Sequence, residues 1–148
     1  MGQLTLPASG PVYLDADVII YSVEKIEPYW SLLQPLWQAA QAGDFLLVGS
    51  DLLVLETLVK PIQAGDKELE QIFRQLLLAS AEVQLYPITR PVLDQAVQLR
   101  AGLNLKSPDA IHAATALSVG CTLFLTNDKG FKRVPNLPVT ILDQALSA

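Results

Sequence analysis

Short apolar runs alternate along this chain with longer segments in which apolar residues recur at helical spacing. The short runs cover residues 12–15, 45–48, 83–86, 122–125 and 139–142, and they predict buried β-strands. The longer segments predict helices over residues 17–25, 29–42, 51–60, 66–80, 89–101 and 107–120. In the segment 66–80 the apolar residues have helical spacing, at Leu69, Ile72, Phe73, Leu76 and Leu77.

Capping and helix-breaking residues set the expected boundaries of these helices. Ser50 can cap the helix over 51–60, and Pro61 is expected to end it. Ser107 followed by Pro108 predicts a helix start, with a capping serine and a proline at the first helical position. Three helices are expected to stop at glycines, namely Gly43, Gly102 and Gly120.

Strands that alternate with helices predict an α/β fold. We expect a three-layer α/β/α arrangement around a central, mostly parallel sheet of about five strands. Residues 1–148 are expected to form a single domain, because no linker, repeat or low-complexity tract divides them. Ligands of open α/β sheets bind beyond the carboxyl ends of the strands. Side chains that follow the strands are therefore the first candidates for chemistry.

Four acidic residues border or interrupt the apolar segments: Asp15, Glu56, Asp109 and Asp128. Asp15 and Asp128 follow predicted strands, and Asp109 lies in the first turn of a helix, near the positive end of its dipole. Isolated carboxylates are costly in an apolar setting, and several that converge repel one another. A divalent cation removes both costs, because carboxylate oxygens suit Mg²⁺ and Mn²⁺. The pattern favours a metal-dependent enzyme.

The composition narrows the choice of function. Hydrophobic residues make up 51% and charged residues 17%, which favours buried parallel strands. The net charge of −5 argues against a protein that coats nucleic acid through a broad basic surface. The single histidine, His112, excludes a zinc site of several imidazoles, and the single cysteine, Cys121, excludes an internal disulfide. No apolar run reaches the ~18 residues of a membrane span. No signal-peptide pattern is present either, so a cytoplasmic location is expected.

The segments around the acids form four motifs that extend over nearly the whole chain. They are residues 13–21 (Tyr-Leu-Asp-Ala-Asp-Val-Ile-Ile-Tyr), Ser50 with Glu56, residues 107–116 (Ser-Pro-Asp-Ala-Ile-His-Ala-Ala-Thr-Ala) and residues 125–131 (Leu-Thr-Asn-Asp-Lys-Gly-Phe). In this order and spacing the motifs resemble the PIN-domain family. Within that family they are similar to the VapC-type toxins of bacterial toxin–antitoxin pairs.

The resemblance implies a metal-dependent ribonuclease in which Asp15, Glu56, Asp109 and Asp128 correspond to an acidic quartet. Asp15 and Asp109 are the expected direct ligands of one or two Mg²⁺ or Mn²⁺ ions, with Asp128 next. Glu56 is expected to bind through water or to orient the attacking water. In-line attack on an RNA phosphodiester then leaves a 5′-phosphate. Asp17 departs from the family's usual Asn or Ser, which adds a ligand or alters substrate preference.

The resemblance also implies a protein inhibitor, the antitoxin, that covers the acidic cleft. An arginine-bearing segment suits that role because guanidinium pairs bidentately with carboxylate. The helix over 29–42 carries Trp30 and Trp37. With the high apolar fraction it predicts a self-associating face, so a homodimer with one antitoxin bound to each subunit is expected.

Simpler interpretations exist for the same residues. Glu56 can pair with Lys60 one turn further on, Asp109 can serve only the helix dipole, and Asp128 can belong to an ordinary turn. His112 is interpreted as a helix-face residue rather than a catalytic one, although its position one turn from Asp109 leaves a substrate contact open. Three basic residues follow Asp128 and suit either a phosphate contact or a solvated turn: Lys129, Lys132 and Arg133.

Two other functions stay open at this point. Asp15 and Asp17 after a strand also resemble the motif of haloacid-dehalogenase-like phosphatases, with Asp15 as nucleophile and Asp17 as general acid. That assignment leaves Glu56 and Asp109 without roles. The second alternative is a non-catalytic PIN-like module that binds RNA or protein, and a complete quartet argues against it. Metal-dependent RNA cleavage, compared with trapping of an aspartyl-phosphate or fluoride adduct, distinguishes the three.

Overall fold

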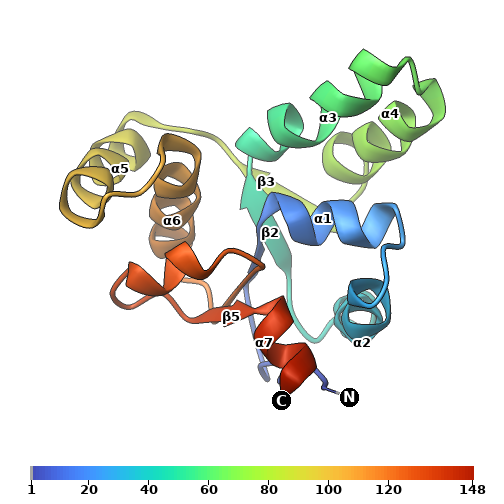
Figure 1. Cartoon of the computed structure of the whole chain (residues 1–148), viewed down its shortest axis with the longest axis horizontal. Coiled ribbons are helices and arrows are strands. Elements are labelled where there is room, and N and C mark those ends of the chain that lie inside the picture. Colours follow the sequence, from blue (N-terminus) through green and yellow to red (C-terminus); the bar gives the residue numbers. More distant parts are fainter. Residues whose placement is uncertain (1) are drawn as a thin grey trace.

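Five parallel strands form the centre of the molecule, in the order β3-β2-β1-β4-β5 (Figure 1). The structure is a computed structural model and describes residues 2–148. The strands are β1 (Val12–Leu14), β2 (Leu47–Ser50), β3 (Val83–Tyr86), β4 (Leu123–Thr126) and β5 (Val139–Ile141). Each neighbouring pair is parallel; in the central pairs Val12 is opposite both Leu47 and Leu123. The predicted α/β class and parallel sheet are confirmed.

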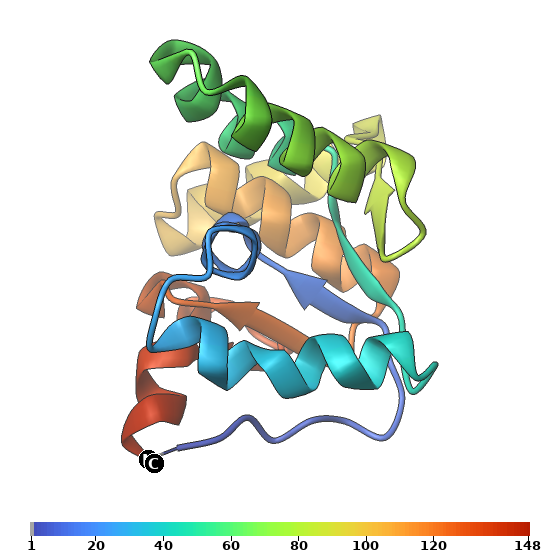
Figure 2. The same cartoon turned by 90° about the vertical axis from the view of Figure 1, so that its right-hand side faces the viewer.

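The helices occupy both faces of this sheet. They are α1 (Ala16–Val23), α2 (Tyr29–Gln41), α3 (Leu52–Ala64), α4 (Lys67–Arg74), α5 (Arg90–Leu103), α6 (Ser107–Val119) and α7 (Leu142–Ser147). A π-helical turn, η1 (Gln75–Ala79), continues α4, and a 3₁₀ turn, η2 (Lys129–Arg133), follows β4. In Figure 1, α5 and α6 lie on one side of the sheet and α1, α2, α3 and α4 on the other. Figure 2 views the molecule from the side that carries α1, α2, α3 and α4, and α2 lies lengthwise at the front of that view.

Alternating side chains of β1 supply both cores. Val12 and Leu14 point into one buried cluster with α1, α2, α3 and α4, while Tyr13 points into a second cluster with α5 and α6. All three side chains are fully buried. A strand with two buried faces reads as continuously apolar, which is why its residues gave no alternating pattern. Strand β1 is therefore held in place by packing against the helices of both layers.

The structure corrects several predicted boundaries. The helix expected to end at Pro61 continues as α3 to Ala64, and it ends at Gly65, whose φ of 69° is left-handed. Pro61 is buried in the last turns of α3, and its own carbonyl accepts from the Asp66 N–H at 2.9 Å. Likewise α5 passes Gly102 and ends at Asn104, which adopts the left-handed φ of 55° instead. The segment expected as one helix over 66–80 changes to a π-helical turn after Arg74.

Other boundary predictions shift by one or two residues. Strand β2 begins at Leu47 rather than at residue 45, because Leu47 is the first of its residues that pairs with β1, opposite Val12. Ser107 is the first residue of α6 rather than its cap, which is Lys106. The N-cap of α3 is Asp51 rather than the predicted Ser50, although the hydroxyl of Ser50 accepts from the Leu52 N–H at 3.0 Å. Among residues 2–148, no helix is both long and apolar enough to cross a bilayer.

Candidate active site

Asp15 is the buried centre of the polar cluster at the carboxyl edge of the sheet. It follows β1 directly and caps α1, and its Oδ1 accepts from the Ala16 N–H at 2.8 Å. Its Oδ2 accepts from the Thr126 hydroxyl, at the end of the neighbouring strand β4, at 2.7 Å. Only 8% of Asp15 is exposed. Burial raises the pKa of Asp15, although His112 and the Thr126 hydrogen bond oppose the rise.

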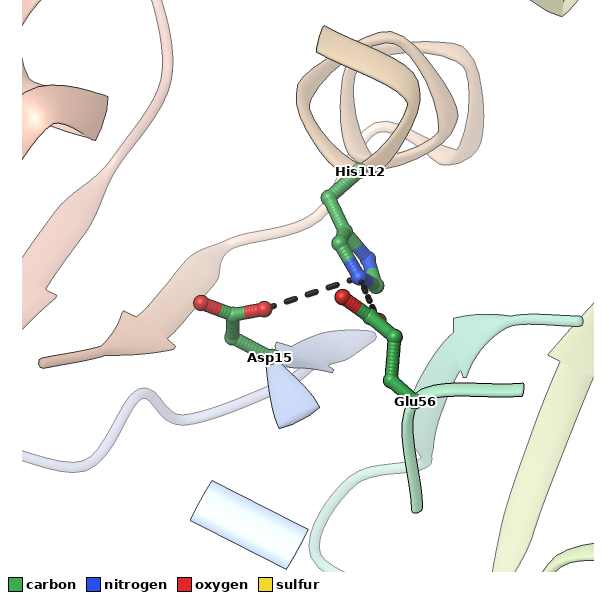
Figure 3. A group of neighbouring side chains, drawn as sticks. All are labelled: Asp15, Glu56 and His112. Atoms are coloured by element: carbon green, nitrogen blue, oxygen red, sulfur yellow. Dashed lines mark hydrogen bonds and ion pairs between the residues drawn. The ribbon is translucent and has the colours of Figure 1, made fainter. Parts of the chain in front are cut away.

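Glu56 and His112 converge on Asp15 from two different helices (Figure 3). Glu56 comes from α3 and His112 from α6. The His112 Nε2 lies 2.6 Å from Glu56 Oε1 and 3.6 Å from Asp15 Oδ1. One ligand atom from each of the three residues lies within 4.8 Å of the other two. Segments that are about 40 and 56 residues apart in the chain thus form one site because two helices and a strand end meet there.

His112 is fully buried and uses both ring nitrogens. Its Nδ1 lies 2.6 Å from the hydroxyl of Tyr13, on the buried strand β1, and the two rings meet edge to face at 5.7 Å. Burial lowers the pKa of His112, but Glu56 and Asp15 raise it and the net pKa is above the ordinary value. The sequence-based interpretation of His112 as a helix-face residue is therefore incomplete, since that face of α6 lies against the acids.

Asp109 and Asp128 border the cluster without entering the close group of three. Asp109 is half-buried in the first turn of α6, and burial raises its pKa, followed by repulsion from Asp128 and Asp15. Asp128 is exposed: its Oδ1 accepts from the Gly130 N–H at 2.8 Å, and its own N–H donates to Thr126 Oγ1 at 3.1 Å. Both carboxylates thus contribute negative potential to the space beside Asp15.

Asp17 is the fifth acid of this edge. Its Oδ2 accepts from the Asn127 N–H at 3.0 Å, whereas its Oδ1 is buried and has no hydrogen-bond partner within the described residues. Burial, followed by repulsion from Asp15, raises the pKa of Asp17 to about 7. Buried polar atoms are rarely left without a partner. An orphaned carboxylate oxygen next to a buried aspartate is the environment that a cation would relieve.

The donor set fits a hard divalent cation. The carboxylates supply oxygen ligands, and the pKa values of Asp15, Asp17 and Asp109 are all raised by burial, with mutual repulsion adding to it. Bringing a divalent ion among them would offset both effects. The structure brings Asp15 and Glu56 together with His112, whereas Asp109 and Asp128 border this group.

A family model described as the PIN domain matches residues 12–137, which is most of the chain. The chain belongs to the PIN-domain family. This match confirms the resemblance drawn from the four motifs. Membership of the family implies a metal-dependent nuclease. The match favours the PIN domain over the phosphatase alternative, which also left Glu56 and Asp109 without roles.

Solved structures show the same fold as this PIN domain. VapBC2 from Rickettsia felis, bound to a DNA fragment from its promoter, has 18% sequence identity and a TM-score of 0.68, covering 88% of this chain and 97% of that one. A toxin–antitoxin complex from Klebsiella pneumoniae has 20% identity and a TM-score of 0.66, with 88% and 97% covered. DNA-bound VapBC from Salmonella typhimurium has 16% identity and a TM-score of 0.65, with 89% and 98% covered. No curated protein sequence matches the chain.

Two contributors to this PIN-domain site were missed in the sequence. Tyr13 was counted in an apolar strand and in the motif over residues 13–21 but was given no role, although a hydroxyl among Val12 and Leu14 is a polar group that needs a partner when buried. Thr126 ends a strand, and its hydroxyl links Asp15 to the backbone of Asp128. A polar residue at a strand's carboxyl end was the available signal for Thr126.

Proposed function

We propose that this PIN domain is a Mg²⁺- or Mn²⁺-dependent endoribonuclease and the VapC-type toxin of a toxin–antitoxin pair. The observation that carries the proposal is the buried carboxylate of Asp15, with Glu56 and His112 within 4.8 Å and an orphaned oxygen of Asp17 beside it. A site of this kind is unfavourable without a cation and requires no side-chain nucleophile. A cytoplasmic location, where RNA is present, is consistent with it.

Each acid has a proposed role in that reaction. Asp15 and Asp109 bind the cation directly, Asp128 completes the oxygen set, and Glu56 orients the attacking water or binds through it. When bound, the cation supplies a Lewis acid that lowers the pKa of water and stabilises charge on phosphoryl oxygens. Thr126 fixes Asp15 through its 2.7 Å hydrogen bond. The closed cores on both faces of β1 keep that carboxylate in one orientation.

Basic side chains on one rim support RNA as the substrate. Lys129, Lys132 and Arg133 lie on η2, directly after Asp128, and Lys106 caps α6 near Asp109. Arg133 joins η2 to the end of α5, because its Nη1 donates to the carbonyl of Leu103 at 3.1 Å. These cations suit contacts with the phosphate backbone on either side of a cleaved bond, despite the net charge of −5.

An antitoxin is the proposed protein partner, by analogy with the toxin–antitoxin complexes of the same fold. A groove of about 620 Å³ along α4 and η1 is lined by two apolar residues, Ile72 and Leu76, by the carboxylates of Glu68 and Glu82, and by the polar side chains of Gln71, Gln75 and Ser80. A segment with an apolar face and basic residues is complementary to this groove. An arginine of the same partner would pair with the acids of the active site.

The expected homodimer is proposed on a different surface from the tryptophan helix. Trp37 is buried and its Nε1 donates to Ser22 Oγ at 2.9 Å, so core packing accounts for it. By contrast, α3 exposes Leu55 (62%), Val59 (42%) and Ile62 (52%) at one-turn spacing. Exposed apolar stripes of this kind mark protein contacts. Leu55→Glu is expected to shift the molecular mass in light scattering from dimer to monomer, whereas Leu78→Glu on η1 should leave the dimer intact.

The decisive test is RNA cleavage with and without metal. The purified chain should cut single-stranded RNA in Mg²⁺ or Mn²⁺, leave 5′-phosphates and stop when EDTA is added. Asp15→Asn should lose activity at least 100-fold, while Glu24→Gln, an exposed acid at the end of α1, should retain it. In cells, the wild-type chain should slow growth and co-expression of its antitoxin should restore it. Cleavage that survives EDTA or Asp15→Asn contradicts the proposal.

A further inference from the structure

One continuous hydrogen-bonded chain connects the buried side of the sheet to the acidic site. It begins at Tyr13 on β1, passes through the ring of His112 on α6 and ends at Glu56 on α3. Tyr13 and His112 are both fully buried, and Glu56 is half-buried. The two hydrogen bonds are each 2.6 Å long. The direction of these bonds decides what His112 can do in the site.

The hydroxyl of Tyr13 sets that direction. Its ring stacks on Phe124, with centroids 5.0 Å apart and planes 4° from parallel, so the hydroxyl has a fixed position. The short hydrogen bond of this hydroxyl, 2.6 Å long, is to His112 Nδ1. The hydroxyl of Thr115 also lies near Tyr13, and its own proton is donated to the carbonyl of Ile111 at 2.7 Å. A buried O–H requires an acceptor, so Tyr13 donates and Nδ1 accepts.

The other nitrogen must then carry the proton. In a neutral imidazole one nitrogen is protonated and the other is not, and in the cation both are. With Nδ1 as an acceptor, the proton is on Nε2, and Nε2–H donates to Glu56 Oε1. A cationic ring would also donate to Glu56 through Nε2. In both states Nε2 has no free lone pair for a metal, although it lies near two carboxylates.

We propose that His112 is a positioning residue that holds the carboxylate of Glu56 toward Asp15 and is not itself a metal ligand. This inference rests on the proposed metal-dependent function. Glu56 is a long side chain on the half-buried face of α3, and the donated hydrogen bond restricts it to one orientation. Tyr13 contacts His112 rather than Glu56. By donating to Nδ1, it leaves Nε2 as the nitrogen that donates to Glu56. Partners of this kind commonly change metal affinity by about 10- to 100-fold when removed.

The chain has one histidine, which makes the proton position directly measurable. Protein labelled with ¹⁵N-histidine gives one imidazole spectrum, recorded first in EDTA and then in saturating Mg²⁺. We expect a directly bonded proton on Nε2 in both spectra. An unprotonated Nε2 in EDTA, or loss of its proton on adding Mg²⁺, overturns the proposal. If Mg²⁺ changes no signal and does not bind, the metal-site proposal fails, whereas the spectrum in EDTA still decides the hydrogen-bond assignment.

Variants test the positioning role through metal affinity. His112→Phe removes the donor with similar shape and should weaken Mg²⁺ binding, measured calorimetrically without RNA, by about 10- to 100-fold. His112→Gln retains a donor near the position of Nε2 and should recover most of that loss. Equal losses in the two variants, or no loss in His112→Phe, contradict the proposal.

Tyr13→Phe keeps the stack on Phe124 and serves where His112→Phe folds poorly. In this variant Nδ1 has no donor facing it, so the single-histidine spectrum should show a mixture of protonation at the two nitrogens. In the cleavage assay kcat should fall more than KM rises, because Glu56 is expected to orient water rather than bind RNA. An unchanged spectrum with Nε2 fully protonated shows that Tyr13 does not fix the ring and overturns that part of the proposal.

Discussion

Replacing Asp17 with Asn is expected to stabilise the metal-free protein at pH 8. The carboxylate has one oxygen bonded to the Asn127 N–H and one buried oxygen without a partner within the described residues. Burial, and then repulsion from Asp15, raises its pKa from the ordinary 3.8 to about 7. An amide in its place keeps an acceptor for Asn127 and has no charge to bury. The variant therefore removes the unfavourable charge and retains the observed hydrogen bond.

The magnitude follows from the pKa. One pKa unit corresponds to about 1.4 kcal/mol, so an increase from 3.8 to about 7 places an upper limit of about 4 kcal/mol on the cost of ionised Asp17. Its side chain is partly exposed, and solvent screening reduces the cost, so we expect a gain of about 1–3 kcal/mol for Asp17→Asn. For a chain of this length each 1 kcal/mol corresponds to roughly 2–4 °C in Tm.

The sign of the pH dependence is defined by the raised pKa. Between pH 4 and pH 7 the folded protein holds a proton on Asp17 that the unfolded chain has lost. The stability from that proton is fully present below pH 4 and disappears as the pH rises through about 7. The free energy of unfolding in EDTA should therefore fall from pH 5 to pH 8 in the wild type. It should fall less in Asp17→Asn, where Asp15 and Asp109 still contribute in the same direction.

Urea unfolding in EDTA at pH 5, 6, 7 and 8 measures this difference. Asp94→Asn, at an exposed position on α5, is the matched control and should follow the wild type at each pH. A second measurement adds Mg²⁺ at pH 8, where the wild type should gain more stability than Asp17→Asn. If Asp17→Asn is less stable than the wild type at pH 8, or has the same pH slope, the burial argument is refuted.

Two further predictions concern the neighbours of Asp15 and the basic rim. Thr126→Val removes the hydroxyl that donates to Asp15 Oδ2 at 2.7 Å, and calorimetry should show Mg²⁺ affinity lower by about tenfold; unchanged affinity would mean that Asp15 needs no such support. The double variant Lys129→Ala/Lys132→Ala should raise KM for RNA several-fold and reduce the salt dependence of binding by up to two phosphate contacts. Lys60→Ala on α3 should change neither quantity, and an equal effect there would show that only the net charge matters.

Sequence reasoning was sufficient for the fold class, and it named two acids that the structure brings together, Asp15 and Glu56, for identifiable physical reasons. Parallel strands with two covered faces are fully buried, so β1, β2 and β4 were visible as short, mainly apolar runs. An acid directly after such a run, as at Asp15, is unusual enough to notice. The order of the acidic motifs added the family, which the match over residues 12–137 confirms.

Local signals were weaker at the helix ends. Pro61 was expected to end α3, but the helix continues and ends at Gly65, where the left-handed conformation is available. Gly102 was expected to end α5, and Asn104 does so instead. Packing of the helix faces against the core determines how far each helix continues, and a breaking residue ends it only where the chain is also free to turn.

Contacts between distant segments were decided only by the tertiary structure. Glu56 faces Asp15 rather than pairing with Lys60, because α3 turns that side toward the end of β1, where His112 from α6 also arrives (Figure 3). The direction of the Tyr13–His112–Glu56 chain depends on which buried donors have acceptors nearby. Hydrogen bonds act over about 3 Å, whereas sequence patterns specify only the face of a helix or strand. Asp15 and Glu56 could therefore be selected from the sequence, but the contacts of Glu56 with His112, and of His112 with Tyr13, could not.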